Sequence, residues 1–272
     1  MKNILSIVTV VYNSPQLLQK TIDNIEKIKT TYDIEYVVID GGSSDGTLNV
    51  IEEHDSVIDH WISEKDNGIY NAMNKAINLT HSKWCLFLNA GDLIIETSIE
   101  SLLHSLEAEQ KAVLCYGGFN QVFKDHTVEK TPKMITSSES FILANPICHQ
   151  ATFYRREYFN KLEENLFDEN YKLISDQVTL FKISSNSIDN IKALNLIICN
   201  YDTNGVSAKF RDLVNEERIA LCRKLLKQGI IQHKIKWNFK INKMILKSVV
   251  YKIMVKFNLV DFYRSFKKLI IK

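Results

Sequence analysis

The feature that most constrains this 272-residue chain is the alternation of short apolar runs with amphipathic segments over its first 115 residues. Apolar and β-branched runs predict four strands, at residues 4–11, 35–39, 57–63 and 84–88. Apolar residues three and four positions apart predict the helices between them, at residues 15–29, 47–53 and 67–80. Strands that alternate with helices are joined by right-handed crossovers, which predicts an α/β fold with a mostly parallel sheet flanked by helices.

The remainder of the chain is less regular. It predicts strands at 112–119 and 191–201, a loop-rich insertion at 124–140, and helices at 176–184 and 211–228. No internal repeat interrupts this pattern. We therefore expect one α/β domain over residues 1–210 and a helical, basic extension over residues 211–272.

The charge of the chain is polarised, although its formal net charge is only +2. Residues 234–272 hold eleven Lys and Arg side chains and a single acid, Asp261. In this segment Lys236, Lys240, Lys243 and Lys247 recur at helical spacing among Trp237, Ile241, Met244 and Ile245. A basic amphipathic helix of this kind predicts contact with an anionic membrane surface, and packing on the main domain is the alternative. We expect no nucleic-acid partner because no reading module accompanies the basic segment, and the sequence indicates no oligomeric state.

The cysteines and the apolar content bear on localisation. Five scattered cysteines without a C-x-x-C pair predict reduced core thiols, as in a cytoplasmic protein, and neither a disulfide framework nor a zinc site. Met1 leads almost directly into the first strand, so we expect no signal peptide. No apolar stretch approaches the roughly 18 residues of a membrane span. Together with the basic helix, these observations predict a protein that lies peripherally on the inner face of the cell membrane.

Polar residues follow all four predicted strands of the first half. They are Asn13, Asp40, Asp66 and Asp92. Ligands of such sheets bind beyond the carboxyl ends of the strands. Asp40 would accept a hydrogen bond from a base, and Asp92 would hold a hard cation that neutralises a leaving pyrophosphate. One such Asp alone is more often a turn or capping residue, so the prediction of a nucleotide-sugar site depends on the four together.

Four motifs extend this interpretation. They are SIVTVVYN at 6–13, VIDGGSSDGT at 38–47, EKDNGIYNAMNK at 64–75 and FLNAGD at 87–92. In their order and spacing they resemble the family 2 glycosyltransferases, whose catalytic domain has the GT-A fold. PICHQA at 146–151 and SDQ at 175–177 resemble acceptor-side motifs of that family. The resemblance covers about residues 3–207 and is strongest to the branch that builds bacterial O-antigens and capsules.

The resemblance implies an inverting, metal-dependent transferase that uses Mn²⁺ or Mg²⁺. Its donor would be a nucleotide diphosphate sugar, usually a UDP-sugar, and its acceptor a saccharide or a lipid-linked saccharide. It implies a nucleotide-sugar site formed by Thr9, Tyr12, Asn13, Asp40, Ser43, Asp66, Asn74 and Asn89. It further implies that Asp92 is the metal ligand, with His149 as a possible second one, and that His149 and Gln150 lie on the acceptor side. Asp176 would be the catalytic base.

Two departures from the family pattern affect the expected chemistry. Asn89 or Gly91, depending on register, replaces the first acid of the metal motif, which leaves Asp92 as the expected sole carboxylate. Weak metal binding before the donor arrives would follow. Ser175 replaces the first acid of the base pair, so Asp176 would act alone. Structural roles stay open for both side chains, helix capping for Asp176 and core hydrogen bonding for His149.

Other classes of protein fit the sequence less well. A sugar nucleotidyltransferase needs a Gly-rich basic loop after its first strand, and residues 11–15 do not form one. A dinucleotide-binding dehydrogenase needs G-x-G-x-x-G at that place, which is also absent. A catalytically degenerate, transferase-like partner subunit stays open. The reduced metal motif favours it, and the retained Asp40, Asp92 and Asp176 disfavour it.

Overall fold

The computed structural model describes residues 4–143, 147–159, 165–202, 210–231 and 234–256. The chain divides into two compact units, Met1–Gly205 and Val206–Lys272. The functions expected for the domains 1–210 and 211–272 stay predictions.

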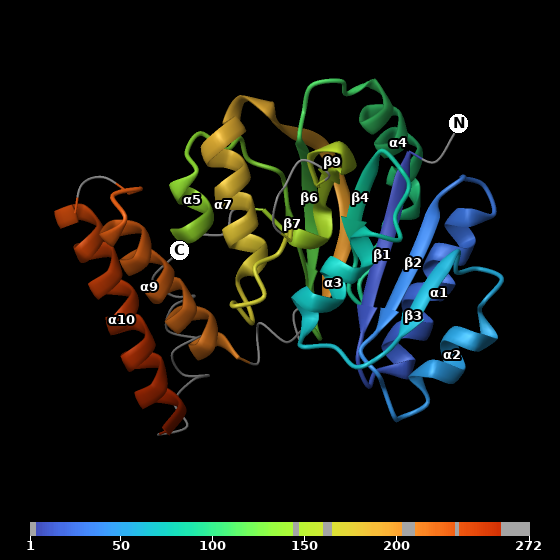
Figure 1. Ribbon diagram of the computed structural model, residues 1–272, viewed down its shortest axis with the longest axis horizontal. Helices are drawn as coiled ribbons and strands as arrows, with labels where there is room; N and C mark the ends of the chain where they lie inside the picture. Colours follow the sequence, from blue (N-terminus) through green and yellow to red (C-terminus); the bar gives the residue numbers. More distant parts are fainter. Residues whose placement is uncertain (1–3, 144–146, 160–164, 203–209, 232–233, 257–272) are drawn as a thin grey trace. The chain divides into compact units, whose positions relative to one another are not determined.

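Four parallel strands form one half of the sheet in the first unit (Figure 1). They are β1 (Leu5–Val11), β2 (Glu35–Asp40), β3 (His60–Ser63) and β4 (Trp84–Phe87), in the order β3-β2-β1-β4. Val8 pairs with Val37 of β2 on one side and with Phe87 of β4 on the other. Each residue of β1, β2 and β4 is buried, which explains their continuous apolar runs. β3 begins at His60, whereas the sequence predicted a start at residue 57. Val57 and Ile58, whose apolar side chains suggested a strand, are buried in the segment before it.

The path of the chain across the sheet reverses after β3. α1 (Pro15–Lys29) and α2 (Thr47–Glu53) carry the chain from β1 outward to β3, and α3 (Ile69–Ile77) returns it across β2 and β1 to β4. Right-handed crossovers in opposite directions place α3 on the other face of the sheet from α1 and α2. Figure 1 shows α3 in front of the strands. The reversal between β1 and β4 is the point at which open α/β sheets bind ligands.

The second half of the sheet is mixed. β8 (Thr152–Arg155) lies antiparallel between β4 and β6 (Leu114–Val122), and β9 (Ile191–Asp202) lies parallel to β6. Two short strands complete the sheet, β5 (Leu93–Ile94) beside β9 and β7 (Thr127–Lys130) beside β6. β6 and β9 confirm the strands expected at 112–119 and 191–201. The segment expected to be loop-rich, 124–140, has no regular structure over most of its length, as predicted, and also contains β7, which the sequence did not indicate.

Further helices complete the first unit. They are η1 (Glu96–Ser98), α4 (Ile99–Ala108), α5 (Glu139–Leu143), η2 (His149–Ala151), α6 (Arg156–Phe159), α7 (Ser175–Ser187) and η3 (Ile188–Asn190). The amphipathic pattern of α1 is confirmed, because Leu18, Ile22 and Ile25 are completely buried in the main core. Truncation of any one of them to alanine would cost about 2–5 kcal/mol of stability. All five cysteines are buried free thiols, as expected.

In the described part of the second unit, α9 (Arg211–Lys227) and α10 (Lys234–Lys256) pack against each other. Trp237 and Ile241 of α10 are buried, whereas Phe239 and Leu246 are exposed. None of the described helices combines the length and the apolar character that a bilayer crossing requires. The side chains of Lys236 and Lys247, and the basic residues after 256, lie outside the part that the structure describes.

Candidate active site

The loops after β1 and β2 interlock at the carboxyl edge of the sheet. Asp40 ends β2 and is fully buried. Its carboxylate accepts hydrogen bonds from the Ser43 backbone N–H at 3.0 Å, from the Ser43 hydroxyl and from the Ser63 hydroxyl at 2.7 Å. Asn13 follows β1 with a positive φ of 46°, and its N–H donates to Ser43 Oγ at 2.8 Å. Its side-chain oxygen accepts from the Ser44 N–H at 3.0 Å. Asp40 therefore shapes this loop, and the expected contact between Asp40 and a base stays a prediction.

Tyr12, Gly41 and Asp66 meet beside these loops. A Cβ atom at Gly41 would lie 2.5 Å from Oδ2 of Asp66 and 3.3 Å from the ring of Tyr12. A larger residue at position 41 would force the Asp66 side chain to move, because real Cβ atoms do not approach other atoms within 3.0 Å. Asp66 is half-buried and also accepts the Gly68 N–H at 2.8 Å, while Tyr12 is 63% exposed. The exposed Tyr12 ring next to a carboxylate provides a surface on which a nucleoside can stack and form hydrogen bonds.

Two of the expected donor residues have internal roles. The Thr9 side chain is completely buried and its hydroxyl accepts a hydrogen bond from Tyr36 at 3.1 Å. This position does not support the expected contact between Thr9 and the nucleobase, because β1 is buried on both faces. Asn74 of α3 donates to the Phe167 carbonyl at 2.8 Å and accepts the Phe167 N–H at 3.0 Å. It also donates to Glu169 at 2.9 Å. Asn74 thus holds the segment before α7, and any effect on the donor is indirect.

Asp92 lies in a buried position after β4 and is next to the end of β9. Its Oδ1 accepts the backbone N–H of Asp202 at 2.9 Å, from a residue 110 positions away. Burial raises the pKa of Asp92 to about 7, and the nearby Asp202 carboxylate adds to this rise. The Asp202 N–H and the more distant Lys20 act in the opposite direction. Burial and a second acid make the negative charge of Asp92 unfavourable, and a bound divalent cation would compensate that charge.

Asp176 lies in the first turn of α7 and is half-buried. Its Oδ1 accepts a hydrogen bond from the hydroxyl of Tyr70 in α3 at 2.9 Å. The alternative of a helix N-cap is not what the structure shows, because Asp176 is inside the helix and Ile174 occupies the cap position. The first turn carries the positive end of the helix dipole, which favours the ionised form of a carboxylate there.

His149 is buried next to Asp176 and has one unoccupied ring nitrogen. Its Nδ1 is 3.2 Å from the hydroxyl of Tyr154, and its ring stacks on Phe87 with centroids 5.5 Å apart. Burial lowers the pKa of His149, and the Asp176 charge opposes this effect. Nε2 is buried without a hydrogen-bond partner among the described residues. Gln150 is also buried and accepts from the Cys148 thiol at 3.0 Å. Pro146 of the same motif lies outside the described residues.

The described residues contain four buried side-chain atoms without a hydrogen-bond partner. They are Asn89 Oδ1, His149 Nε2, Arg156 Nε and Ser175 Oγ. Three of the four belong to the motifs that the sequence marks as the site or lie next to Asp176. Buried polar groups are satisfied in nearly all native structures, and each exception needs an explanation. Buried oxygen and nitrogen atoms without hydrogen-bond partners are expected where a polar ligand supplies the missing hydrogen bonds.

Sequence reasoning missed three residues that the fold brings to these acids. The Tyr201 hydroxyl of β9 lies within the electrostatic influence of Asp92, Asp202 and Asp176, and burial together with these charges raises its pKa to about 12. Asp202 supplies the second carboxylate beside Asp92, and Tyr70 holds Asp176. Tyr201 ends the strand predicted at 191–201 and Asp202 follows it, as Asp40 follows the strand predicted at 35–39, so the polar strand end was a usable signal. Tyr70 carried no such signal.

The donor set near Asp92 fits a hard divalent cation. The Asp92 carboxylate offers the oxygen ligand that Mg²⁺ and Mn²⁺ prefer, the Asp202 charge acts on it, and the side-chain oxygen of Asn89, three residues earlier, has no hydrogen-bond partner. The set is incomplete for six-fold coordination, which leaves positions for phosphate oxygens and water. Asp202, from the distant strand β9, brings a second carboxylate close enough to raise the pKa of Asp92, and the expectation that Asp92 is the sole carboxylate on a metal stays a prediction.

Comparisons with known proteins identify the family of this chain. The model of the family described as glycosyl transferase family 2 matches residues 6–171. The chain is 27% identical over 206 residues to a PGL/p-HBAD biosynthesis glycosyltransferase of Mycobacterium tuberculosis, which covers 74% of this chain and 77% of that relative. It is 29% identical over 185 residues to an uncharacterized glycosyltransferase of Haemophilus influenzae, which covers 63% and 54% of the two chains.

Solved structures share the fold. A fragment of S. aureus TarS in complex with UDP-GlcNAc aligns with a TM-score of 0.61 and 16% identity, over 80% of this chain and 66% of that chain. The chain thus spans slightly less than two thirds of the TarS fragment. Glucosyl-3-phosphoglycerate synthase of Mycobacterium tuberculosis, in complex with Mn²⁺, UDP and phosphoglyceric acid, aligns with a TM-score of 0.54 and 13% identity over 86% and 81%. These likenesses confirm the expected GT-A arrangement of the sheet and helices.

The family match covers more than half of the chain and includes the edge of the sheet at which Asp40, Asp66 and Asp92 lie. The chain therefore belongs to glycosyl transferase family 2 and is a glycosyltransferase that takes its sugar from a nucleotide sugar.

Proposed function

We propose that this protein is an inverting, metal-dependent glycosyltransferase that moves a sugar from a UDP-sugar to a saccharide acceptor. The observation that carries the proposal is the pair of held acids, Asp92 at the backbone of Asp202 and Asp176 at the hydroxyl of Tyr70, together with the unpartnered Asn89 and His149 atoms. The similar TarS fragment was solved in complex with UDP-GlcNAc, and the similar phosphoglycerate synthase in complex with UDP and Mn²⁺. These complexes support the choice of UDP and Mn²⁺ for this chain.

Different residues at the carboxyl edge of the sheet would bind different parts of the nucleotide-sugar donor. Tyr12 offers an exposed aromatic face to the base, next to Asp66 and the loop that Asp40 and Ser43 shape. Asp92, with Asp202 and Asn89, would hold Mn²⁺ or Mg²⁺ at the pyrophosphate. The metal, when bound, supplies positive charge that neutralises the departing nucleoside diphosphate. His149 and Gln150 would line the acceptor side.

Asp176 would act as the base of a direct displacement. Tyr70 occupies Oδ1, so the other carboxylate oxygen would take the proton of the acceptor hydroxyl. The acceptor oxygen forms its bond to the anomeric carbon, while the bond from that carbon to the phosphate oxygen breaks and its electron pair leaves with the nucleoside diphosphate. Attack from the face opposite the leaving group inverts the anomeric configuration, as in inverting glycosidases.

The acceptor we propose is a lipid-linked intermediate of bacterial surface polysaccharide synthesis, such as O-antigen or capsule. The mycobacterial relative and TarS do not point specifically to these polymers. The support comes from the motifs and from the second unit, where exposed Phe239 and Leu246 lie on α10 with the Lys243 position between them. Positions 239, 243 and 246 share one helix face, which suits contact with an anionic membrane surface.

Calorimetric titration with UDP, GDP and CMP, each with and without Mn²⁺, tests the proposal. We expect Mn²⁺-dependent binding of UDP that is lost in Asp92→Asn and kept in the control Asp189→Asn, an exposed acid in η3. UDP binding that ignores both Mn²⁺ and Asp92 would contradict the site. UDP binding without hydrolysis or transfer of any UDP-sugar would favour a degenerate partner subunit.

A further inference from the structure

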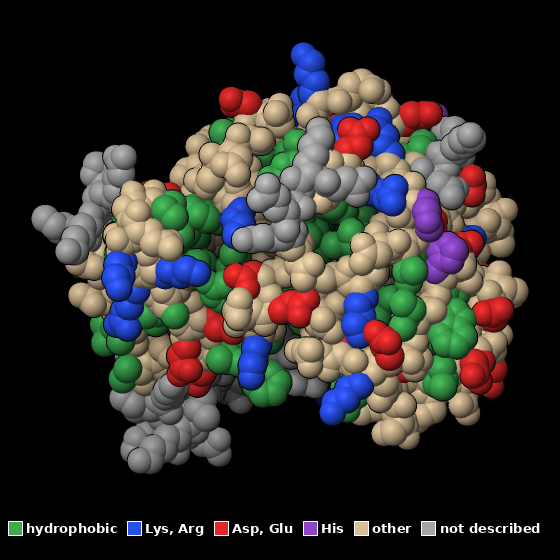
Figure 2. Space-filling view, viewed as in Figure 1, with side chains coloured by type: hydrophobic (Ala, Val, Ile, Leu, Met, Phe, Trp, Pro, Cys, Tyr) green, Lys and Arg blue, Asp and Glu red, His purple; other side chains and the backbone are tan. Residues whose placement is uncertain are grey.

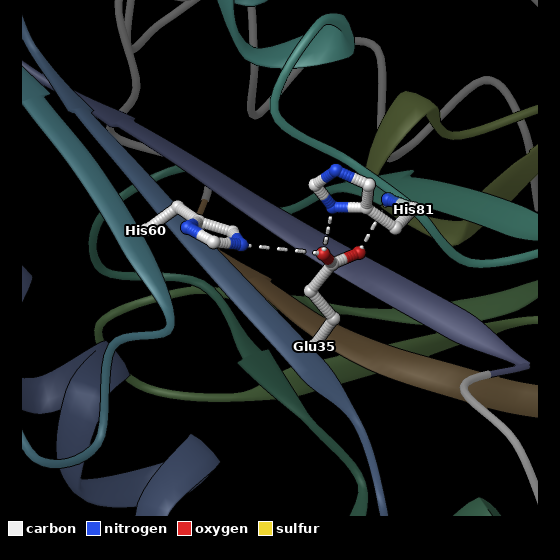
Figure 3. A group of neighbouring side chains, drawn as sticks. All are labelled: Glu35, His60 and His81. Atoms are coloured by element: carbon white, nitrogen blue, oxygen red, sulfur yellow. Dashed lines mark hydrogen bonds and ion pairs between the residues drawn. The ribbon is translucent and has the colours of Figure 1, made fainter.

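A second group of metal-ligating side chains lies at the opposite edge of the sheet from the candidate active site. Glu35 begins β2, His60 begins β3, and His81 precedes β4, so all three lie at the amino ends of parallel strands (Figure 3). Glu35 and Asp40 are at opposite ends of the six-residue β2, roughly 17 Å apart along the strand. Figure 2 shows histidine side chains gathered at the surface over the amino ends of β2 and β3.

Both imidazoles approach the same carboxylate oxygen. Oε1 of Glu35 is 2.8 Å from Nδ1 of His81 and 3.8 Å from Nε2 of His60. One potential ligand atom from each residue lies within 4.8 Å of the other two, and the two rings are 5.4 Å apart. Three ligands at about 2.1 Å from one zinc ion are about 3.4 Å from each other in a tetrahedral site. The observed separations lie on both sides of that value, so small side-chain movements would bring the three ligands around one ion.

Glu35 is held in place for this role. Its other oxygen, Oε2, accepts hydrogen bonds from the Ser6 hydroxyl, from the His81 N–H at 2.7 Å and from the Ser82 N–H at 3.3 Å. Burial raises the pKa of Glu35, but these hydrogen bonds and the one from His81 together lower it below its ordinary value. Hydrogen bonds that orient a ligating carboxylate in this way support metal sites in general.

The two histidines have the freedom that binding requires. Their side chains are 45% exposed for His60 and 60% exposed for His81, while Glu35 is almost fully buried. The imidazoles can therefore turn, and water can occupy the remaining position of an ion. Two protonated imidazoles this close would repel each other, whereas two neutral imidazoles and one carboxylate attract a dication. The pair of Asp125 and His126, at 2.7 Å, has only one imidazole and serves as a natural comparison.

We propose that Glu35, His60 and His81 form a binding site for a zinc-class divalent transition metal, separate from the sugar-transfer site. Imidazole nitrogen selects Zn²⁺, Ni²⁺ or Cu²⁺, whereas the oxygen ligands around Asp92 select Mn²⁺ or Mg²⁺. Among the residues that the structure describes, these three form the one group of His, Cys, Asp and Glu side chains with this proximity. The ion would join β2, β3 and the turn before β4, and so would stabilise the sheet without contacting the donor.

Titration of the full-length protein with Zn²⁺, followed by calorimetry and by the thermal unfolding midpoint, tests the site. We expect one ion per chain, a raised midpoint, and binding at least tenfold weaker in His60→Ala and in His81→Ala. His126→Ala is the matched control, an equally exposed histidine beside a carboxylate, and should bind Zn²⁺ as the unaltered protein does. Replacement of Zn²⁺ by Co²⁺ should give a visible absorption spectrum that depends on the same two histidines.

Asp92→Asn separates this site from the active site. Zn²⁺ binding should persist in Asp92→Asn, and Mn²⁺-dependent UDP binding should persist in His60→Ala. Zn²⁺ binding that is unchanged in both histidine variants, or that disappears in Asp92→Asn, would overturn the proposal. If His81→Ala does not fold, because His81 contacts the buried Glu35 directly, His60→Ala still decides, since the His60 nitrogen is 3.8 Å from the carboxylate and too far away for a hydrogen bond.

Discussion

Tyr70 and Asp176 are 106 positions apart in the chain, yet the Tyr70 hydroxyl donates a hydrogen bond to Asp176 Oδ1 at 2.9 Å. The bond joins α3, which follows the donor-side strand β3, to α7, which carries the proposed base. The bond occupies one carboxylate oxygen of Asp176, and in the proposed reaction the other oxygen would take the proton of the acceptor hydroxyl.

Replacement of Tyr70 by Phe should lower kcat by roughly tenfold, the effect of losing one hydrogen bond of about 1.5 kcal/mol to a charged group. The KM for the donor should change little, because Tyr70 contacts the proposed catalytic base Asp176 and is not one of the proposed donor-binding residues. Steady-state kinetics of the variant measures both values. Tyr158→Phe, in α6, is the control. An unchanged kcat would show that Tyr70 does not position the base.

Replacement of Asp176 by Asn should abolish transfer but leave the binding of UDP and Mn²⁺ intact. The amide keeps the acceptor oxygen for Tyr70 but cannot take a proton, so a loss of kcat of at least a hundredfold is expected. Activity assays and calorimetry on the same variant separate these effects. A loss of UDP binding together with activity would instead place Asp176 in the donor site.

The raised pKa of Asp92 predicts a pH-dependent stability of the metal-free protein. An unfolded Asp ionises near pH 3.9, whereas Asp92 ionises near pH 7 in the folded state. Between these values the folded protein binds more protons than the unfolded chain, so this group makes the protein less stable as the pH rises from about 4 to 7. Asp92→Asn should therefore be more stable than the unaltered protein at pH 8 and similar to it at pH 4.

Denaturant titrations of the metal-free protein at pH 4, 6 and 8 measure this difference. Mn²⁺ should reverse the order at pH 8, because the ion replaces the proton on Asp92 and binds only the carboxylate form. A stability difference between the two proteins that does not change with pH would contradict the assignment of the raised pKa to Asp92.

Replacement of Asn74 by Ala should destabilise the segment that leads into α7. The variant removes three buried or partly buried hydrogen bonds and leaves the Phe167 N–H and carbonyl without their partner, at a cost of about 2–4 kcal/mol. Hydrogen exchange should increase first around Phe167. Asn78→Ala, at the end of the same helix, is the control. Equal hydrogen exchange around Phe167 in Asn74→Ala and Asn78→Ala would show that Asn74 does not anchor this segment.

Exchange of Phe239 and Leu246 for serine should weaken binding to vesicles that contain anionic lipid. Both side chains are exposed on α10, so the change should not affect the packing of Trp237 and Ile241 on the other side of the helix. Co-sedimentation with anionic and with neutral vesicles measures the effect. If the unaltered protein does not bind the vesicles, or if the variant binds them equally well, the proposed contact between α10 and a membrane is wrong.

Several parts of the fold and of the site were open to prediction from the sequence. The apolar runs of β1, β2 and β4 and the amphipathic pattern of α1 set the parallel half of the sheet, because burial on both faces demands such runs. The polar residues after them then had to lie at one edge. The mixed half was less accessible, since β8, β5 and β7 are short strands whose pairing depends on neighbours that local patterns do not specify.

The sequence by itself determined the family, the parallel core and the positions of Asp40, Asp66 and Asp92 at strand ends, because these follow from local periodicity and from contiguous motifs. Only the tertiary structure decided that Asp202 lies beside Asp92, that Tyr70 holds Asp176 and that Thr9 is enclosed in the core. It also decided that His60 and His81 both approach one oxygen of Glu35. The physical reason is the range of these contacts. Each depends on the pairing and crossover of several strands, so residues far apart in sequence meet only after the whole sheet has formed.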